Sequence, residues 1–391
     1  MTSSLFHHQH QQSRSGLPAL DLRALARRAA LPVGLAVAAA VALIVAGGPL
    51  QAFADALDRA LDANPLWVGA AAVFELLSFA GYVALLWLVG RRTTRRLGLR
   101  QSAEVSLGGA AATRLLPTGG LGGAALTIFA FGRAGLNMRA ATRTLLAFLV
   151  VLYSVFLASI AVAGGLLALG LAPGDGPLAL TAVPAIGAVV VIAGALALAA
   201  TRPSGGGQVD AAAPGASRLA RTQAALHTAR ATAGDAVRDA IALVRSGDVR
   251  LLGAVAWWAF DAAVLWAMLQ ALGAPPSLAV MVFAYFVGQI ANSIPIPGAA
   301  SGGLVAVLLA FGVETDLALA AVLAYRSVAI WLPAPIGLVA LAGLRRTFAR
   351  WAEEDAPAAP VPAAAPVRTL HPEPLQLAVW PRQEPAVRVP A

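Results

Sequence analysis

Long apolar runs separated by short polar segments make up most of this 391-residue chain. Most are close to the length that crosses a bilayer core as a helix, about 20 residues. None shows the alternation of apolar and polar positions that is typical of a strand. The pattern therefore predicts an all-α polytopic membrane protein with about seven spanning helices. The predicted spans cover residues 31–47, 66–90, 144–171, 178–200, 251–272, 277–294 and 317–344.

Two further apolar segments, at about 104–132 and 294–312, are broken by proline and glycine. The apolar stretch after each break is too short to cross a bilayer. When the chain is shifted along itself so that one break lies on the other, the two segments align without gaps. The matched positions are Pro117 with Pro297, Gly122 and Gly123 with Gly302 and Gly303, and Phe131 and Gly132 with Phe311 and Gly312. The match predicts a repeated, discontinuous element.

Arginine is distributed unevenly between the polar segments, and all 28 basic residues are arginine. If residues 1–30, 91–104, 133–143, 201–250 and 345–391 lie inside, that side holds 25 of the 28. The positive-inside rule is satisfied only if each broken segment enters the membrane and returns to the same side. We therefore expect a pseudo-symmetric inverted repeat with two re-entrant hairpins, in the cytoplasmic (inner) membrane, with both termini cytoplasmic.

The chain divides into a basic N-terminal tail (1–30), a membrane domain (31–344) and an Ala/Pro-rich C-terminal tail (345–391). We expect the N-terminal tail to be disordered and the stretch from Glu353 onward to be disordered or polyproline-like. The run at 31–47 has the outline of a signal peptide, but a retained span is the preferred interpretation. Within the loop 201–250, Leu219 and Leu226 belong to an Ala-rich pattern with apolar residues on one side. That pattern predicts either an amphipathic helix on the anionic inner leaflet or a solvated connector.

The composition excludes several function classes. The chain is 59% hydrophobic and 12% charged, with a mean hydropathy of +0.75. It has no Cys, and its five His residues lie outside the predicted spans, so we expect no metal site and no cofactor. Ser301 consequently has no imidazole base for nucleophilic catalysis. The net charge of +9 is explained by cytoplasmic loops, and no nucleic-acid partner is expected.

Charged residues inside apolar segments are costly and are therefore candidate functional residues. Glu75 and Asp261 lie near the middle of predicted spans, and either could carry a proton, pair with an arginine or fix helix packing. Arg114 lies just before the first break and Arg326 lies in the last span. Two polar residues before the second break could line a cavity or bond across helices. They are Gln289 and Asn292.

The broken helices themselves form the second group of candidates. A helix that starts inside the membrane leaves free N–H groups that can bind an anion such as phosphate. Close packing of helices through glycine is the alternative role. The candidate residues at the two breaks are Pro117, Gly119, Gly120, Gly122, Gly123, Pro295, Pro297, Gly298, Ser301, Gly302 and Gly303.

The motifs RLLPTGGLGG and FGRAG in the first half, with YFVGQIANSIPIPG and LAYRSVAIWLPAPIGL in the second, resemble the lysylphosphatidylglycerol synthase transmembrane family. The resemblance extends over about 31–344 and implies a flippase-like domain. Such a domain moves a phospholipid or a lipid-linked substrate between leaflets, with Arg114 and Arg326 suited to the lipid phosphate. Family members often carry an acid where this chain has Leu304, so the resemblance leaves the charge of the head group open.

Members of that family that carry a soluble synthase domain also transfer an amino acid to the lipid. Only 47 residues follow Leu344 here, so we expect a stand-alone member that is not an enzyme. Two other functions stay open. One is a proton-coupled small-solute transporter that uses Glu75 and Asp261. The other is a non-transporting membrane partner of an envelope-synthesis enzyme. Homodimerisation also stays open.

Overall fold

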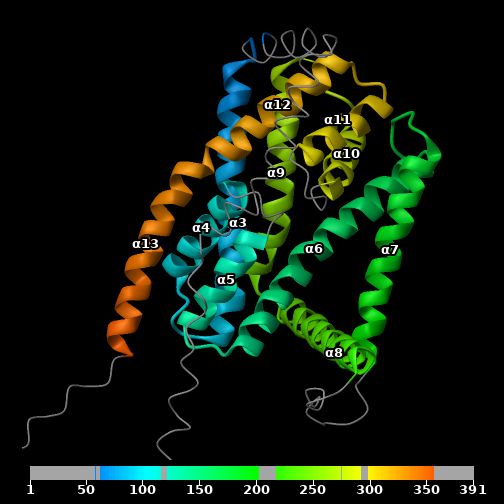
Figure 1. The fold of residues 1–391 in the computed structure, drawn as a ribbon. Coiled ribbons are helices and arrows are strands. Elements are labelled where there is room, and N and C mark those ends of the chain that lie inside the picture. Colours follow the sequence, from blue (N-terminus) through cyan, green and yellow to red (C-terminus); the bar gives the residue numbers. More distant parts are fainter. Residues whose placement is uncertain are drawn as a thin grey trace, which may run out of the picture. The chain divides into compact units, whose positions relative to one another are not determined.

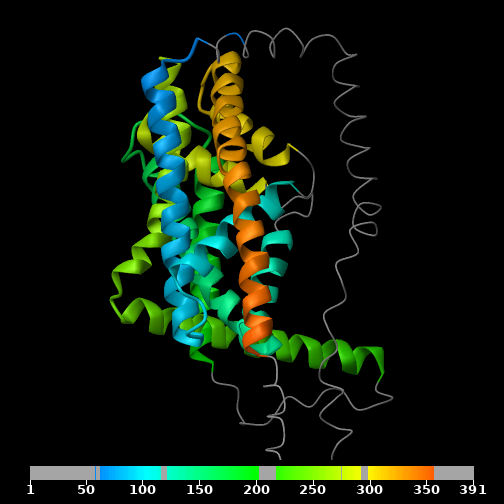
Figure 2. The same cartoon turned by 90° about the vertical axis from the view of Figure 1, so that its left-hand side faces the viewer.

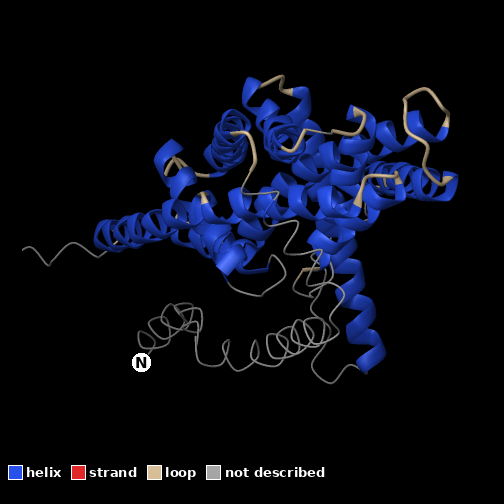
Figure 3. Ribbon diagram, turned by 90° about the horizontal axis from the view of Figure 1, so that it is seen from above, coloured by secondary structure: helices blue, strands red, loops and turns tan. Residues whose placement is uncertain are grey.

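The structure is a computed structural model that describes residues 58, 62–115, 121–201, 217–273, 275–291 and 298–355. Within these ranges all regular elements are helices and none is a strand (Figure 3). The prediction of an all-α protein is therefore confirmed. The predicted span at 31–47, the N-terminal tail and the part of the C-terminal tail after residue 355 lie outside the described residues.

Five helical segments in the described part of the chain are long and apolar enough to cross a membrane. They are α3 (Pro65–Thr93), α6 (Met138–Ala168), α7 (Leu178–Ala200), α9 (Leu252–Ala271) with the short helix η1 (Val249–Leu251) before it, and α12 (Thr315–Trp331) continued by α13 (Pro333–Glu354). Five of the predicted spans are thus found as long apolar helices. The chain is a multi-pass membrane protein.

The predicted span at 277–294 is wrong. It contains the 13-residue helix α10 (Leu278–Ile290), about 20 Å long at 1.5 Å per residue, whereas a bilayer core is about 30 Å thick. Helix α10 instead pairs with α11 (Ala299–Ala310) as the first limb of a hairpin. The other broken segment forms a second hairpin of α4 (Leu99–Leu115) and α5 (Leu121–Arg133).

The two hairpins lie toward opposite ends of the helix bundle. In Figure 1 the α4–α5 hairpin occupies the lower half, beside the lower end of α3, and the α10–α11 hairpin occupies the upper half. Figure 2 shows the same arrangement from the side. Each hairpin thus enters from one end and returns to it, as the arginine distribution predicts.

The shift that places Pro117 on Pro297 also aligns the helices. It places α3, α4, α5 and α6 on α9, α10, α11 and the α12–α13 segment, and α7 and α8 (Arg218–Arg245) connect the two repeats. The repeats are also interlocked, because each hairpin packs on the long helix of the other repeat. Helix α10 contacts α6, where the rings of Phe286 and Phe156 lie 5.4 Å apart. Helix α4 contacts α13, where Thr347 donates a hydrogen bond of 2.7 Å to the buried carboxylate of Glu104.

Helices α3 and α9 cross with their backbones in contact at Gly81 and Gly253. A Cβ atom built on Gly253 would lie 2.3 Å from the carbonyl oxygen of Gly81, so neither position has room for a side chain. Small residues let membrane helices approach this closely. Aromatic rings surround the crossing, among them Phe79 and Trp257 with centroids 5.2 Å apart. The crossing brings the middle of α9, where Asp261 lies, into the protein interior.

Candidate functional site

A buried hydrogen-bond network centres on Asp261 in the middle of α9. Tyr285 of α10 and Tyr325 of α12 both donate to the same carboxylate oxygen, Oδ2, the second at 2.9 Å. Gln289 of α10 donates from Nε2 to the hydroxyl oxygen of Tyr325 at 3.1 Å. Tyr285 and Gln289 are one helical turn apart, so both face the same neighbours. The network thus joins three helices of the second repeat near the end of the first limb of its hairpin.

Arg326 lies next to this network. Its guanidinium carbon is 5.2 Å from the centroid of the Tyr325 ring, a cation–π geometry. Its Nε and Nη2 atoms are buried and have no hydrogen-bond partner among the described residues. Buried donors are nearly always satisfied in native proteins, and a guanidinium fork matches phosphate or carboxylate oxygens. Arg326 therefore has two buried donors, at the edge of the network, of the kind that suit an anionic acceptor.

Glu75 of α3 is the second intramembrane acid and is 1% exposed. It lies close enough to Tyr325 to interact with its hydroxyl group electrostatically. The structure therefore gathers Glu75, Asp261, Gln289 and Arg326, which the sequence analysis selected from separate segments. No ion pair joins Asp261 to Arg326, because the carboxylate bonds to the two tyrosines instead.

Gly123, at the first break, lies where the two limbs of the hairpin pack closely. The N–H of Gly123 donates to Oγ1 of Thr113 at 3.0 Å, across the hairpin from α5 to α4. A Cβ atom on Gly123 would lie 2.9 Å from the carbonyl oxygen of Gly109. The N–H of Gly123 is thus already bonded within the hairpin, and the neighbouring Gly122 lies in the same first turn of α5.

The second break repeats this arrangement at the equivalent glycine. A Cβ atom on Gly303 would lie 2.7 Å from Cβ of Ala291 and 3.1 Å from the carbonyl oxygen of Gly288. Leu304, the position where the family resemblance leads one to expect an acid, is fully buried against Gly288. Gly123 and Gly303 therefore have the packing role that was the alternative to anion binding.

Three other candidates lie at the start of α11. Gly298 is its N-cap and has a φ of +84°, a left-handed conformation that favours glycine. Ser301 and Gly302 follow in the first turn, where the N–H of Gly302 donates to the carbonyl oxygen of Gly298 at 2.8 Å. The space beside Gly302 is open within 4 Å as far as the described residues extend.

Several candidates lie where the structure describes no side chain. Arg114 is in the last turn of α4, and only its backbone is described. Residues outside the described ranges are Pro117, Gly119, Gly120, Asn292, Pro295 and Pro297. Their assignment to the site stays a prediction.

Tyr285 and Tyr325 were missed by the sequence analysis. A tyrosine in an apolar helix usually contributes its ring to packing. The sequence pattern therefore does not predict that its hydroxyl group belongs to a polar site. A signal was nevertheless present, because the chain has only four tyrosines. One of these two lies four residues before Gln289 and the other directly precedes Arg326.

We expect the variant Asp261→Asn to be less stable than the wild-type protein by about 1–3 kcal/mol. The neutral amide oxygen is a weaker acceptor for the two tyrosine hydroxyls than a carboxylate oxygen is. The midpoint of thermal unfolding in detergent measures this loss. Asp175→Asn, a change on an exposed loop, is the matched control. Equal midpoints for the two variants would show that the network does not hold the three helices together.

Two comparisons with known proteins bear on this site. The family model described as the lysylphosphatidylglycerol synthase TM region matches residues 29–337, which include all five long apolar segments at least in part and both hairpins. No curated protein matches the chain.

Proposed function

The chain belongs to the lysylphosphatidylglycerol synthase transmembrane family, and from this premise we propose that it moves a phospholipid or lipid-linked molecule between the leaflets of a bilayer. The matched part is the transmembrane region, so the proposal concerns movement of the lipid and not aminoacyl transfer. We place the protein in the cytoplasmic membrane, and the positive-inside rule puts the end of the bundle that carries α8 inside.

The observation that carries the proposal is the pair of buried donors on Arg326. A lipid phosphate is an anion that can enter the membrane domain with its acyl chains still in the bilayer. The guanidinium group would bind it through charge-assisted hydrogen bonds. Asp261 and Gln289 hold Tyr325, on whose ring Arg326 rests, in place through the hydrogen-bond network. In this proposal the network positions the phosphate-binding residue.

In this proposal the lipid moves because the two interlocked repeats rock against each other. Because each hairpin packs on the long helix of the other repeat, rocking one repeat against the other would move both hairpins together. The hairpins enter from opposite ends (Figure 1), so such a motion would open one end of the bundle as it closes the other. This is alternating access around a site near the middle of the bundle.

Reconstitution into liposomes tests the function. Phospholipids labelled in one leaflet are expected to reach the other leaflet faster in vesicles that contain the protein than in protein-free vesicles. Vesicles that hold an unrelated helical membrane protein are the control for nonspecific leakage of lipid. Lipid movement at the control rate would contradict the proposal.

Two buried acids favour a second candidate function, a proton-coupled transporter of a small solute. Glu75 and Asp261 are both buried in the middle of spanning helices, where an acid can take up and release a proton. The same vesicles separate the two functions. Solute uptake driven by a pH gradient, without movement of labelled lipid, would favour the second.

A further inference from the structure

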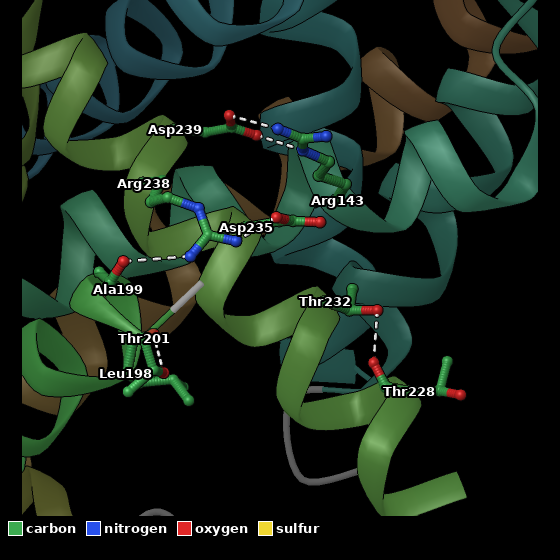
Figure 4. A network of polar contacts seen from close by, with 9 residues as sticks. All are labelled: Arg143, Leu198, Ala199, Thr201, Thr228, Thr232, Asp235, Arg238 and Asp239. Atoms are coloured by element: carbon green, nitrogen blue, oxygen red, sulfur yellow. Dashed lines mark hydrogen bonds and ion pairs between the residues drawn. The ribbon is translucent and has the colours of Figure 1, made fainter. Parts of the chain in front are cut away.

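Helix α8, which connects the two repeats, is anchored to the bundle through its C-terminal half. Arg143 of α6 binds both carboxylate oxygens of Asp239, at 2.5 and 2.6 Å (Figure 4). Arg238 donates to the carbonyl oxygen of Ala199 at 3.1 Å, at the end of α7, and also pairs with Asp235. These contacts hold α8 at the N-terminal end of α6 and the C-terminal end of α7, where the two spans leave the membrane. In Figure 2 it runs across this end of the bundle, transverse to the spanning helices.

The N-terminal half of α8, from Arg218 to Thr232, extends sideways beyond the bundle (Figure 2). It carries two large apolar side chains that the described part of the chain leaves uncovered, because Leu219 is 69% and Leu226 is 64% exposed. The charged residues of this half are all arginine, and its sequence contains no acid. Exposed leucine combined with arginine and no acid is typical of a helix that lies on a membrane surface.

The uncovered leucines lie on the same side of α8 as the residues that pack on the bundle. At 100° per residue, Leu219, Leu226 and Val237 fall within about 20° of one another around the helix axis. Val237 is buried where α8 packs on the ends of α6 and α7. The side that packs on the bundle therefore continues past its edge at the same level, where it carries the two leucines and the exposed Arg230, about 20° from Leu219 around the helix. Since α6 and α7 leave the membrane at this level, the lipid head groups lie next to that side of the helix.

We propose that residues 218–232 lie on the head-group layer of an anionic leaflet. Leu219 and Leu226 would enter the boundary with the acyl chains, and the arginines would bind lipid phosphates. Each arginine near an anionic surface adds electrostatic attraction to that surface. This membrane contact would hold the connection between the repeats against the bilayer while the bundle moves. It does not depend on which molecule the protein transports.

Single cysteines test the proposal, because the chain has no cysteine of its own. Leu226→Cys is labelled with an environment-sensitive fluorophore in the full-length protein. Thr228→Cys, about 200° away around the helix and also exposed, is the matched control. In vesicles that contain phosphatidylglycerol we expect blue-shifted emission at 226, quenched by spin-labelled lipid. The label at 228 should be quenched by aqueous iodide instead.

The lipid composition tests the electrostatic part. In phosphatidylcholine vesicles, or after replacing Arg218, Arg221 and Arg230 together by glutamine, the label at 226 should lose much of its protection from iodide. Equal exposure of the two labels in the anionic vesicles would overturn the proposal. Identical protection of residue 226 in the two lipid compositions would also overturn it. Size-exclusion chromatography of each variant shows beforehand that the protein is folded.

Discussion

Replacing Arg326 by alanine is expected to slow lipid movement by about tenfold or more in reconstituted vesicles. The change removes the two buried donors for which the described residues provide no acceptor. Hydrogen bonds to charged groups contribute about 1.5–3 kcal/mol each, and about 1.4 kcal/mol corresponds to a factor of ten. The measurement is the rate at which labelled phospholipid changes leaflets, with equal amounts of protein in the membrane.

Two further variants make this result specific. Ser327→Ala changes the next residue on α12, whose exposed hydroxyl bonds only to the carbonyl oxygen of Leu323, and should keep the wild-type rate. Arg326→Lys keeps the charge but loses the planar fork of donors, so its rate should be intermediate. An alanine variant that is folded and moves lipid at the wild-type rate would rule out Arg326 as the phosphate-binding residue.

Gly288→Ala is expected to destabilise the protein by about 3 kcal/mol, the upper end of the range for overpacked positions. The added Cβ atom would lie 2.6 Å from Cα, 2.8 Å from Cβ and 2.9 Å from the nitrogen of Leu304. None of these atoms can move without shifting α11. The two limbs of the hairpin would therefore separate, and thermal unfolding in detergent should begin at a lower temperature.

The control for this prediction lies across the same hairpin. A Cβ atom on Gly302 meets no described atom within 4 Å, so Gly302→Ala should leave stability unchanged or raise it by about 0.5–1 kcal/mol through helix propensity. If both variants unfold at the same temperature, close packing of α10 and α11 does not stabilise the hairpin. The matched breaks would then need another explanation.

The site candidates were predictable from the sequence because of their charge. Glu75, Asp261 and Arg326 are ionisable groups within apolar runs, and such residues are rare enough to select without a structure. What each of them binds was not predictable. Asp261 could have paired with an arginine, and it bonds instead to two tyrosines from helices that follow it by 24 and 64 residues.

The end of the first helix of the second hairpin was not predictable from the local sequence. Residues 277–294 are apolar over nearly the length of a span, and hydropathy alone does not record where the helix ends. The helix stops at Ile290, about 20 Å from its start, and the paired limb α11 packs on it through Gly288 and Gly303. A short helix is stable at this depth because the other limb and α6 cover it.

The sequence by itself determined the helical membrane class, the two breaks and their match without gaps, because these follow from local apolar length and from the positions of Pro and Gly. It also predicted opposite entry of the hairpins from the distribution of arginine. Only the tertiary structure decided that Gly123 and Gly303 pack helices, that tyrosines hold Asp261, and that each hairpin rests on the other repeat. Those outcomes depend on contacts between residues far apart in the chain. The hydrophobic pattern of a segment indicates only whether that segment prefers lipid or water. It does not indicate which distant residues the segment contacts.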